Sequence, residues 1–513
     1  MPFNSLAFAL FFLALLVPWA LVPPGRRWAV LLVGSYAFCA LGQPSAVAFL
    51  AAATVYAHAI AIRMAHAPGS LGRRALLWVG VAGILGLLLL TKYLDFLLSS
   101  AHAAIGAFAH LEVYRPLAWI VPLGISFYSL RLIGYLLDVA KGRTAAERHL
   151  GVFAGYVAFF PELLAGPIDR AGGLIPQLRA PESFVEARVA RGLTRFAWGL
   201  FKKVVIADRL SLFVDPVYAD PTSFRGVSLI VASVFFAFQI FCDFSGYSDM
   251  AIGVGEVLGF QLAKNFDRPY HSESISEFWR RWHMTFSSWL RDYVFLPLAY
   301  SSARWAEERS LLGIRLREEY WSYAVATMGT MLLGGLWHGA SWTFVAWGGL
   351  IGSYMVFSRF TKKIRSRWVR AAGLHRVPRL RAVLRVVSVF VLMDVAWVFF
   401  RARTLRDALY VLTHLLDGTG PYVARLATTG ISGFSDRAVL QPLLLGHSLG
   451  EFATAVGAIA LLEGVHFLDC RGGLYARLMA RPAAIRFGLY YALVLLILAF
   501  GVFEARTFIY AQF

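Results

Sequence analysis

The chain has 513 residues, of which 58% are hydrophobic and 15% aromatic, and its formal net charge at pH 7 is +19. Soluble domains are roughly 45–50% apolar, so this composition excludes an ordinary soluble protein and indicates a polytopic membrane protein. The basic residues lie in clusters between apolar runs, which argues against nucleic acid as a partner and favours loops that face anionic membrane lipid.

Apolar runs along the chain predict membrane helices, because a helix that crosses the bilayer needs about 20 apolar residues. Such runs cover residues 4–22, 28–41, 46–62, 76–98, 117–137, 193–213, 228–246, 322–339, 341–359, 386–400, 450–467 and 484–503. Two further runs, 150–167 and 247–262, are interrupted by glycine or proline, as in re-entrant or broken helices that line a cavity. The sequence therefore predicts an all-α polytopic protein with about 11–13 spanning helices, forming one membrane domain over residues 1–513.

Lysine and arginine predict the orientation of these helices, because cytoplasmic loops carry an excess of both. The first clusters lie near residues 26–27, 63–74 and 141–148, and the strongest covers 362–385 without one acidic residue. A last cluster at 471–486 precedes the final apolar run. We therefore expect both termini to be extracytoplasmic.

His338 is a titratable group in an apolar and aromatic run, residues 331–344. On a continuous helix, Gly334 lies one turn below it and Ser341 about one turn above it, which would leave open space for a ligand. A histidine at membrane depth is a hypothesis for a functional site. The alternative is an interhelical hydrogen bond, with the glycines serving close helix packing.

A polar segment, 266–293, predicts an amphipathic helix at the cytoplasmic interface, with Ser274 as N-cap and Glu277 completing a capping box. One predicted face carries Arg280, His283, Ser287 and Arg291, and another carries Trp282, Phe286, Trp289 and Tyr293. The alternative role is an interfacial anchor. The cationic face would suit a donor that carries phosphate groups, such as coenzyme A, and the candidate donor-binding residues are Arg280, Arg281, Arg291 and Ser287.

Asp243 and Asp249 are acids at the edge of an apolar run. Buried acids need partners, and we expect structural ion pairs, with arginines of the amphipathic helix as candidate partners. The three cysteines are far apart, and no zinc motif, phosphate-binding loop, nucleophile elbow or catalytic carboxylate pair is present. The sequence thus predicts no metal site.

Taken in chain order, these segments resemble the membrane-bound O-acyltransferase (MBOAT) family, and within it most closely the bacterial branch that O-acetylates alginate. The resemblance covers about residues 120–400 and the C-terminus. The segments that carry it are Pro122-Leu-Gly-Ile-Ser-Phe-Tyr, Phe159-Phe-Pro-Glu-Leu-Leu-Ala-Gly-Pro-Ile, Phe201-Lys-Lys, Asp243-Phe-Ser-Gly-Tyr-Ser-Asp, Asn265-Phe-Asp-Arg-Pro-Tyr, Phe278-Trp-Arg-Arg-Trp-His, Trp289-Leu-Arg-Asp-Tyr, Gly335-Leu-Trp-His-Gly-Ala-Ser-Trp and Trp397-Val-Phe-Phe-Arg-Ala.

The resemblance implies a ring of transmembrane, re-entrant and interfacial helices around a thinned central tunnel, with acetyl-CoA as cytoplasmic donor and an extracytoplasmic acceptor. His338 matches the catalytic histidine, which would act as general base, and His283 matches a second motif histidine. Gly334, Gly339 and Trp337 are tunnel candidates. Many relatives carry a further histidine where this chain has Ile351, so no third histidine is assigned.

The C-terminus, Phe508-Ile-Tyr-Ala-Gln-Phe513, resembles the aromatic ending of exporting members of the family. By that resemblance Tyr510 carries the acetyl group from the tunnel to an extracytoplasmic SGNH-type transferase that works with polysaccharide-synthesis machinery. The alternative is an aromatic residue at a membrane interface.

Two other functions stay open from the sequence. One is acyl transfer to peptidoglycan, cellulose, teichoic acid or a lipid instead of an alginate-like polysaccharide. The other is a transporter or flippase, a class that often shows repeated halves with matched broken helices. Broken helices are predicted here, but repeated halves are not.

Overall fold

The computed structural model describes residues 1–67, 69–106, 114–117, 120–182, 184–306, 318–430, 436–470, 473–504 and 508–509. These residues form helices joined by turns and loops, and no strand occurs among them. The protein is therefore all-α, as predicted. The described part of the chain divides into two compact units, unit 1 with residues 1–196 and 248–264, and unit 2 with residues 197–247 and 265–509.

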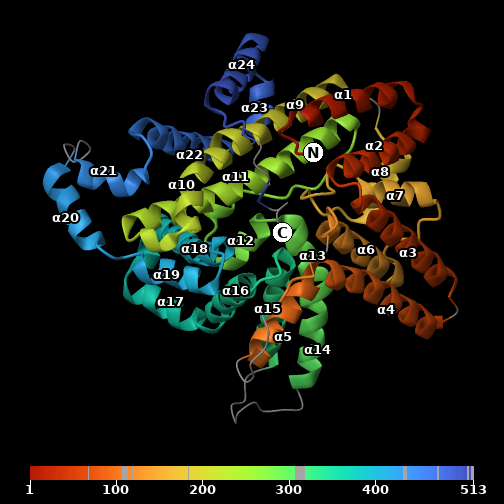
Figure 1. Ribbon diagram of the computed structural model, residues 1–513, viewed down its shortest axis with the longest axis horizontal. Helices are drawn as coiled ribbons and strands as arrows, with labels where there is room; N and C mark the ends of the chain where they lie inside the picture. The colour runs from red at the N-terminus through yellow and green to blue at the C-terminus, as the bar shows by residue number, and fades with distance from the viewer. Residues whose placement is uncertain are drawn as a thin grey trace. The chain divides into compact units, whose positions relative to one another are not determined.

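The helices are labelled in Figure 1. Those that begin in unit 1 are α1 (Leu6–Leu21), α2 (Arg27–Gly42), α3 (Ala46–His66), α4 (Gly69–Leu88), α5 (Leu94–Gly106), α6 (Ile125–Ala140), α7 (Leu150–Ala158), α8 (Ala171–Arg179) and α9 (Glu186–Phe201), with the short turns η1 (Pro24–Arg26) and η2 (Leu89–Tyr93).

Unit 2 contains the remaining helices, although α11 continues into unit 1. They are α10 (Asp208–Ala219), α11 (Val227–Leu258), α12 (Ile275–Arg281), α13 (Met284–Leu290), α14 (Leu296–Ala306), α15 (Glu318–His338), α16 (Trp342–Phe360), α17 (Lys362–Ala371), α18 (Pro378–Arg401), α19 (Leu405–His414), α20 (Thr419–Thr429), α21 (Arg437–Leu444), α22 (Leu449–Asp469), α23 (Leu474–Met479) and α24 (Ala483–Phe500). The short turns are η3 (Lys202–Ala207), η4 (Pro221–Ser223), η5 (Pro269–His271), η6 (Arg291–Phe295) and η7 (Leu374–Arg376).

Six helices of the described chain are long and apolar enough to cross a membrane. They are Ala46–His66, Gly69–Gly106, Val227–Leu258, Pro378–Arg401, Leu449–Asp469 and Ala483–Phe500. Each contains most of a predicted span, and the protein is a multi-pass membrane protein. The other predicted spans fall on helices that are shorter or less uniformly apolar, so the larger number of 11–13 spans stays a prediction.

The two segments predicted to be broken behave differently. In unit 1, α7 ends at Ala158 and residues 159–170 are not helical, as predicted. By contrast, α11 runs without a break to Leu258, so the prediction of a broken helix over 247–262 is wrong. Glycine weakens a helix by about 1 kcal/mol. Close packing of α11 against α9 offsets this loss, and it requires glycine, because a Cβ on Gly253 would lie 2.5 Å from the Gly192 carbonyl oxygen of α9.

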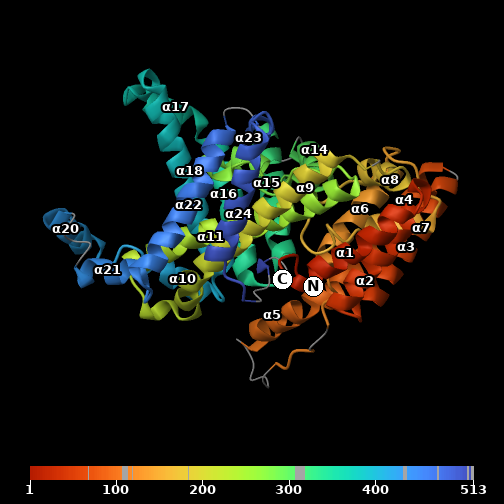
Figure 2. The ribbon, with the colours of Figure 1, turned by 90° about the horizontal axis from the view of Figure 1, so that it is seen from above.

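In unit 2, α15 and α16 form an antiparallel hairpin and lie side by side in both views (Figure 1, Figure 2). Glycines make this approach possible. A Cβ on Gly335 would overlap the Phe344 carbonyl oxygen, and one on Gly348 would overlap the Met331 carbonyl oxygen. Small residues at a helix interface allow backbones to approach closely within a membrane. The hairpin therefore fixes the residues at its tip, and His338 is one of them.

Candidate functional site

His338 is the last residue of α15, and only 3% of it is exposed. The helix ends there because Ser341 starts the next helix: its side chain accepts a hydrogen bond from the Thr343 backbone N–H, 3.3 Å away. The sequence prediction that Ser341 lies one helical turn above His338 is therefore wrong.

Four aromatic rings surround the imidazole of His338, all within unit 2. The centroid distances are 4.9 Å to Trp337, 5.1 Å to Trp347, 5.5 Å to Phe400 and 5.6 Å to Phe286. Each pair meets edge to face, with interplanar angles between 69° and 90°, which is a preferred geometry for aromatic groups. The rings hold the imidazole in one orientation and keep water away from it.

The glycines next to His338 serve packing. A Cβ on Gly339 would overlap the ring of Phe344, and one on Gly334 would lie 3.2 Å from Cδ1 of Leu290. The Phe344 ring therefore fills the space beside Gly339, which corrects the prediction that this glycine widens a tunnel. The alternative of close helix packing holds at this position.

His283 is fully buried and has a left-handed backbone, with φ of 42°. Its Nδ1 lies 3.1 Å from Oδ1 of Asn265. The same oxygen accepts the Thr285 backbone N–H at 3.3 Å and the Thr285 hydroxyl at 2.9 Å. Because a backbone N–H only donates, this atom of Asn265 is the acceptor, so the proton lies on Nδ1 of His283 and Nε2 is the basic nitrogen. Burial lowers the pKa of His283 well below its usual value, and the nearby His338 lowers it further.

The break at His283 corrects the predicted amphipathic helix. Helix α12 ends at Arg281 and α13 begins at Met284, whose backbone N–H donates to the Asn265 carbonyl at 2.8 Å. Trp282 is fully buried, with ring centroids 5.4 Å from Phe278 and 4.9 Å from Trp397. These tertiary contacts outweigh the local helical pattern. Arg280, His283, Ser287 and Arg291 consequently do not form one continuous helical face.

The candidate donor-binding residues lie around this break with partners of their own. Arg281 pairs with Glu277 at 2.7 Å, Arg291 pairs with Asp292 at 2.8 Å, and the Ser287 hydroxyl donates to the Trp282 carbonyl at 3.1 Å. Arg280 is exposed. Ser274 is the N-cap, as predicted, but Glu277 accepts from the Glu273 N–H instead of the Ser274 N–H, so the predicted capping box is incomplete.

The two predicted histidines are brought together by shared aromatic neighbours. Phe286 has its ring centroid 4.9 Å from that of His283 and 5.6 Å from that of His338. Trp337 lies 6.2 Å from the first and 4.9 Å from the second, and the Phe286 and Trp337 rings stack at 4.4 Å. We call His283, His338, Phe286 and Trp337 the histidine cluster.

Asp243 and Asp249 form ion pairs, as expected, but not with arginines of 275–291. In unit 2, Nζ of buried Lys203 lies 2.8 Å from Oδ1 of both Asp243 and Asp208. In unit 1, Nε of Arg195 lies 3.0 Å from Oδ1 of Asp249. The lysine pair of residues 202–203, inside an apolar run, was the sequence signal for a buried cation that needed acidic partners.

The Lys203–Asp243 pair also holds the C-terminal segment, a contact that the sequence did not reveal. The Ile509 backbone N–H donates to Oδ2 of Asp243 at 2.8 Å. The Phe508 ring lies 4.4 Å from Nζ of Lys203 and meets the Tyr247 ring edge to face at 5.0 Å. Tyr510 itself lies outside the described residues. Ile351, the position at which the resemblance led us to look for a third histidine, is fully buried in α16.

The fold and this cluster define a multi-pass all-α membrane protein with two buried histidines among aromatic rings. Comparison with known proteins supplies its family. The model of the MBOAT, membrane-bound O-acyltransferase family, matches residues 148–314. The probable alginate O-acetylase AlgI of Azotobacter vinelandii is 38% identical over 410 residues, covering 79% of this chain and 76% of the relative.

Two relatives with other names are also similar. The peptidoglycan O-acetyltransferase of Helicobacter pylori is 32% identical over 432 residues, covering 78% of this chain and 76% of the relative. The teichoic acid D-alanyltransferase of Bacillus subtilis is 25% identical over 260 residues, covering 48% and 63%. The chain belongs to the membrane-bound O-acyltransferase family, in the AlgI-like branch, and is an O-acetyltransferase. The transporter alternative is therefore set aside.

Proposed function

We propose that the protein transfers acetyl groups from cytoplasmic acetyl-CoA across a bacterial inner membrane, for O-acetylation of an extracytoplasmic, alginate-like polysaccharide. The observation that carries this proposal is the histidine cluster, because it places two imidazoles in one water-excluded environment within unit 2. The similarity to alginate O-acetylases over about four-fifths of the chain supports the acceptor class.

In the proposed reaction His338 is the general base. It accepts the proton of the acceptor hydroxyl as that oxygen attacks the thioester carbonyl carbon. The new C–O ester bond forms while the C–S bond breaks, and the same imidazole returns the proton to the departing thiolate. The edge-on rings of Trp337 and Trp347 keep the imidazole oriented for both proton transfers.

His283 is the second catalytic candidate. The Asn265 hydrogen bond leaves Nε2 as its basic atom, and its lowered pKa keeps the ring neutral at neutral pH. We assign it to the donor side of the cluster. Arg281 and Arg291 would bind the phosphates of coenzyme A by exchanging their surface carboxylate partners, with Arg280 and Ser287 as further contacts.

Tyr510 is the proposed acyl carrier. The contacts of Phe508 and Ile509 with Lys203 and Asp243 support this role, because they hold the chain immediately before Tyr510 in a fixed position. The acetylated tyrosine would pass its group to an SGNH-type transferase outside the membrane, which requires an extracytoplasmic C-terminus. An aromatic residue at the membrane interface remains the alternative for Tyr510.

The test combines a deletion strain with complementation. The strain complemented with wild-type protein is expected to regain O-acetyl groups on its surface polysaccharide, and the strain carrying His338→Ala is not, with equal amounts of protein in the membrane. His66→Ala, at an exposed histidine of α3, is the matched control and should restore acetylation. Wild-type acetyl content with His338→Ala would overturn the proposal.

Peptidoglycan is the second candidate acceptor, favoured by the relative from Helicobacter pylori. Mass spectrometry of isolated glycan strands and of secreted polysaccharide from the same strains separates the two. Loss of acetyl groups from the peptidoglycan alone would select this second acceptor and reject the first.

A further inference from the structure

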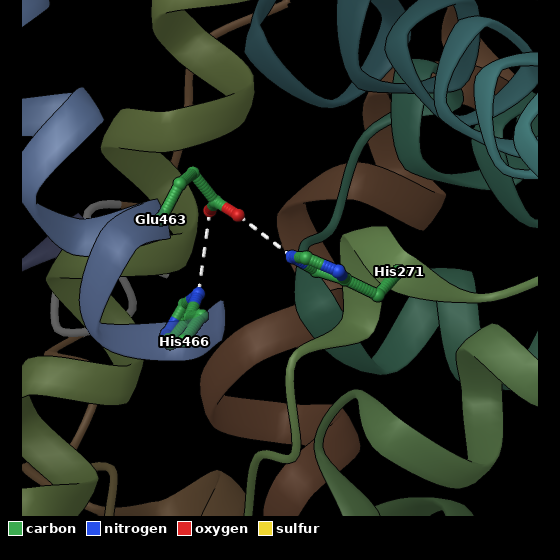
Figure 3. Close-up of side chains that lie close together, drawn as sticks. All are labelled: His271, Glu463 and His466. Carbon is green, nitrogen blue, oxygen red and sulfur yellow. Dashed lines mark hydrogen bonds and ion pairs between the residues drawn. The ribbon is translucent and has the colours of Figure 1, made fainter. Parts of the chain in front are cut away.

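Three side chains of unit 2 meet away from the histidine cluster: His271, Glu463 and His466. Figure 3 shows the Glu463 carboxylate directed at both imidazoles. Oε2 of Glu463 lies 2.7 Å from Nε2 of His271, and Oε1 lies 3.3 Å from Nδ1 of His466. The three donor atoms all lie within 4.8 Å of one another.

The elements that carry these residues hold them in place. Glu463 and His466 are separated by one turn of α22, so they share a helical face, and the same Glu-x-x-His spacing supplies metal ligands in helical bundles. His271 ends the turn η5. Its neighbour Tyr270 is buried and its hydroxyl donates to the Ala237 carbonyl at 2.5 Å, which fixes the turn against α11.

We propose that His271, Glu463 and His466 form a site for a divalent transition-metal ion, with Zn²⁺ as the best fit. Two imidazole nitrogens and one carboxylate oxygen are the donor set of three-ligand zinc sites, in which water takes the fourth position. Zinc ligands bound at about 2.0–2.2 Å in a tetrahedron stand roughly 3.3–3.5 Å apart. The 3.3 Å between Nδ1 of His466 and Oε1 of Glu463 matches this spacing. Nε2 of His271, at 2.7 Å from Oε2 of Glu463, is closer than this spacing and has to move outward by at least roughly 0.6 Å.

The site is open enough for an ion to enter. The side chains of His271, Glu463 and His466 are 38%, 31% and 13% exposed. On the inner side the Phe241 ring lies 5.7 Å from the ring of His466 and provides an apolar wall. A bound cation would therefore lie near the C-terminal end of α22, with one open side and one sheltered side.

A metal here would brace the segment that holds His283. Residues 265–271 run from Asn265, the hydrogen-bond partner of His283, to the ligand His271. An ion shared with α22 would fix the His271 end of this short segment, while the hydrogen bonds of Asn265 fix the other end. The binding site does not depend on the proposed acetyl transfer, so failure of one proposal leaves the other standing.

The test measures metal binding to the purified full-length protein in detergent, prepared without a histidine tag and stripped with a chelator. One equivalent of Co²⁺ is expected to give the intense visible absorption of a four-coordinate site, and Zn²⁺ is expected to displace it. Zn²⁺ should also raise the thermal midpoint, since an ion that binds only the folded state stabilises it.

Variants test whether the three residues bind the metal. Glu463→Gln and His466→Ala should each weaken Co²⁺ binding by at least roughly tenfold, whereas His375→Ala, at an exposed histidine in the similar turn η7, should leave it unchanged. If the wild-type protein takes up no stoichiometric metal, the three residues form only a hydrogen-bonded bridge and the proposal is wrong. Binding that survives both ligand variants would equally overturn it.

Discussion

Two buried polar centres of unit 2 are stabilised in different ways. His283 and His338 lie among aromatic rings that hold them by shape and exclude water. Lys203 lies between the carboxylates of Asp208 and Asp243 and is held by charge. The first arrangement suits groups that gain and lose protons, whereas the second suits a permanent anchor, and it does anchor the C-terminal segment.

The largest effect on stability is expected at the charged centre around Lys203. Lys203→Met would leave two buried carboxylates without their cation, and breaking a buried ion pair in this way costs about 3–5 kcal/mol. We expect a steep loss of folded protein in thermal unfolding of the detergent-solubilised chain. Lys362→Met, at an exposed lysine of α17, should unfold as wild type. An unchanged midpoint for Lys203→Met would show that the anchor contributes nothing to stability.

A smaller loss is expected at the hairpin that carries His338. Gly335→Ala places a methyl group against the Phe344 backbone, and such overpacking costs about 1–3 kcal/mol. Gly349→Ala is the matched control, because its nearest contact is the flexible end of Leu332 at 3.5 Å. The two thermal midpoints should differ, with the Gly335 variant lower; equal midpoints would contradict the close packing of α15 and α16.

The pH dependence of activity tests the role of His283 in the histidine cluster. An acidic side chain in Asn265→Asp would place a negative charge beside His283 and raise its pKa, because an anion favours the imidazolium form. His283 would then become protonated at a higher pH than in the wild-type protein. The acid limb of the pH–activity profile should therefore move up by about 1–3 pH units.

Thr285→Val is the control for that shift. It removes a hydroxyl donor from Asn265 without adding charge, so its acid limb should stay in place. An identical limb for Asn265→Asp and wild type would mean that the neutral form of His283 is not required.

The smallest effect on stability is expected at the surface. The half-buried pair of Arg281 and Glu277 lies near the surface and contributes about 1 kcal/mol or less, so Arg281→Ala should unfold almost as wild type. If Arg281 binds the donor, the KM for acetyl-CoA rises several-fold with little change in kcat. Glu277→Gln, which removes only the partner, should not raise the KM. Equal KM values for all three proteins would exclude Arg281 from donor binding.

Local sequence patterns were sufficient for the helical class and for the six clear spans, because a long apolar run has few alternatives in a membrane. They failed at Trp282 and His283, where the amphipathic pattern continues but contacts with Trp397 and Asn265 break the helix. Pairings between distant segments, such as Lys203 with Asp243 or His271 with Glu463, have no local signature. Local patterns singled out His338 in its apolar run and His283 on the predicted cationic face, and the family resemblance supplied their roles. Their shared aromatic neighbours required the fold.

The central claim is that His338 performs the proton transfers of acetyl transfer inside the histidine cluster. The direct test is the rate at which the purified protein, supplied with its SGNH-type transferase and acceptor polysaccharide, releases coenzyme A thiol from acetyl-CoA. His338→Gln should lower kcat by about 100-fold or more, the usual range for loss of a general base, while the thermal midpoint stays near that of wild type. A folded His338→Gln protein that turns over within a few-fold of wild type would contradict the claim.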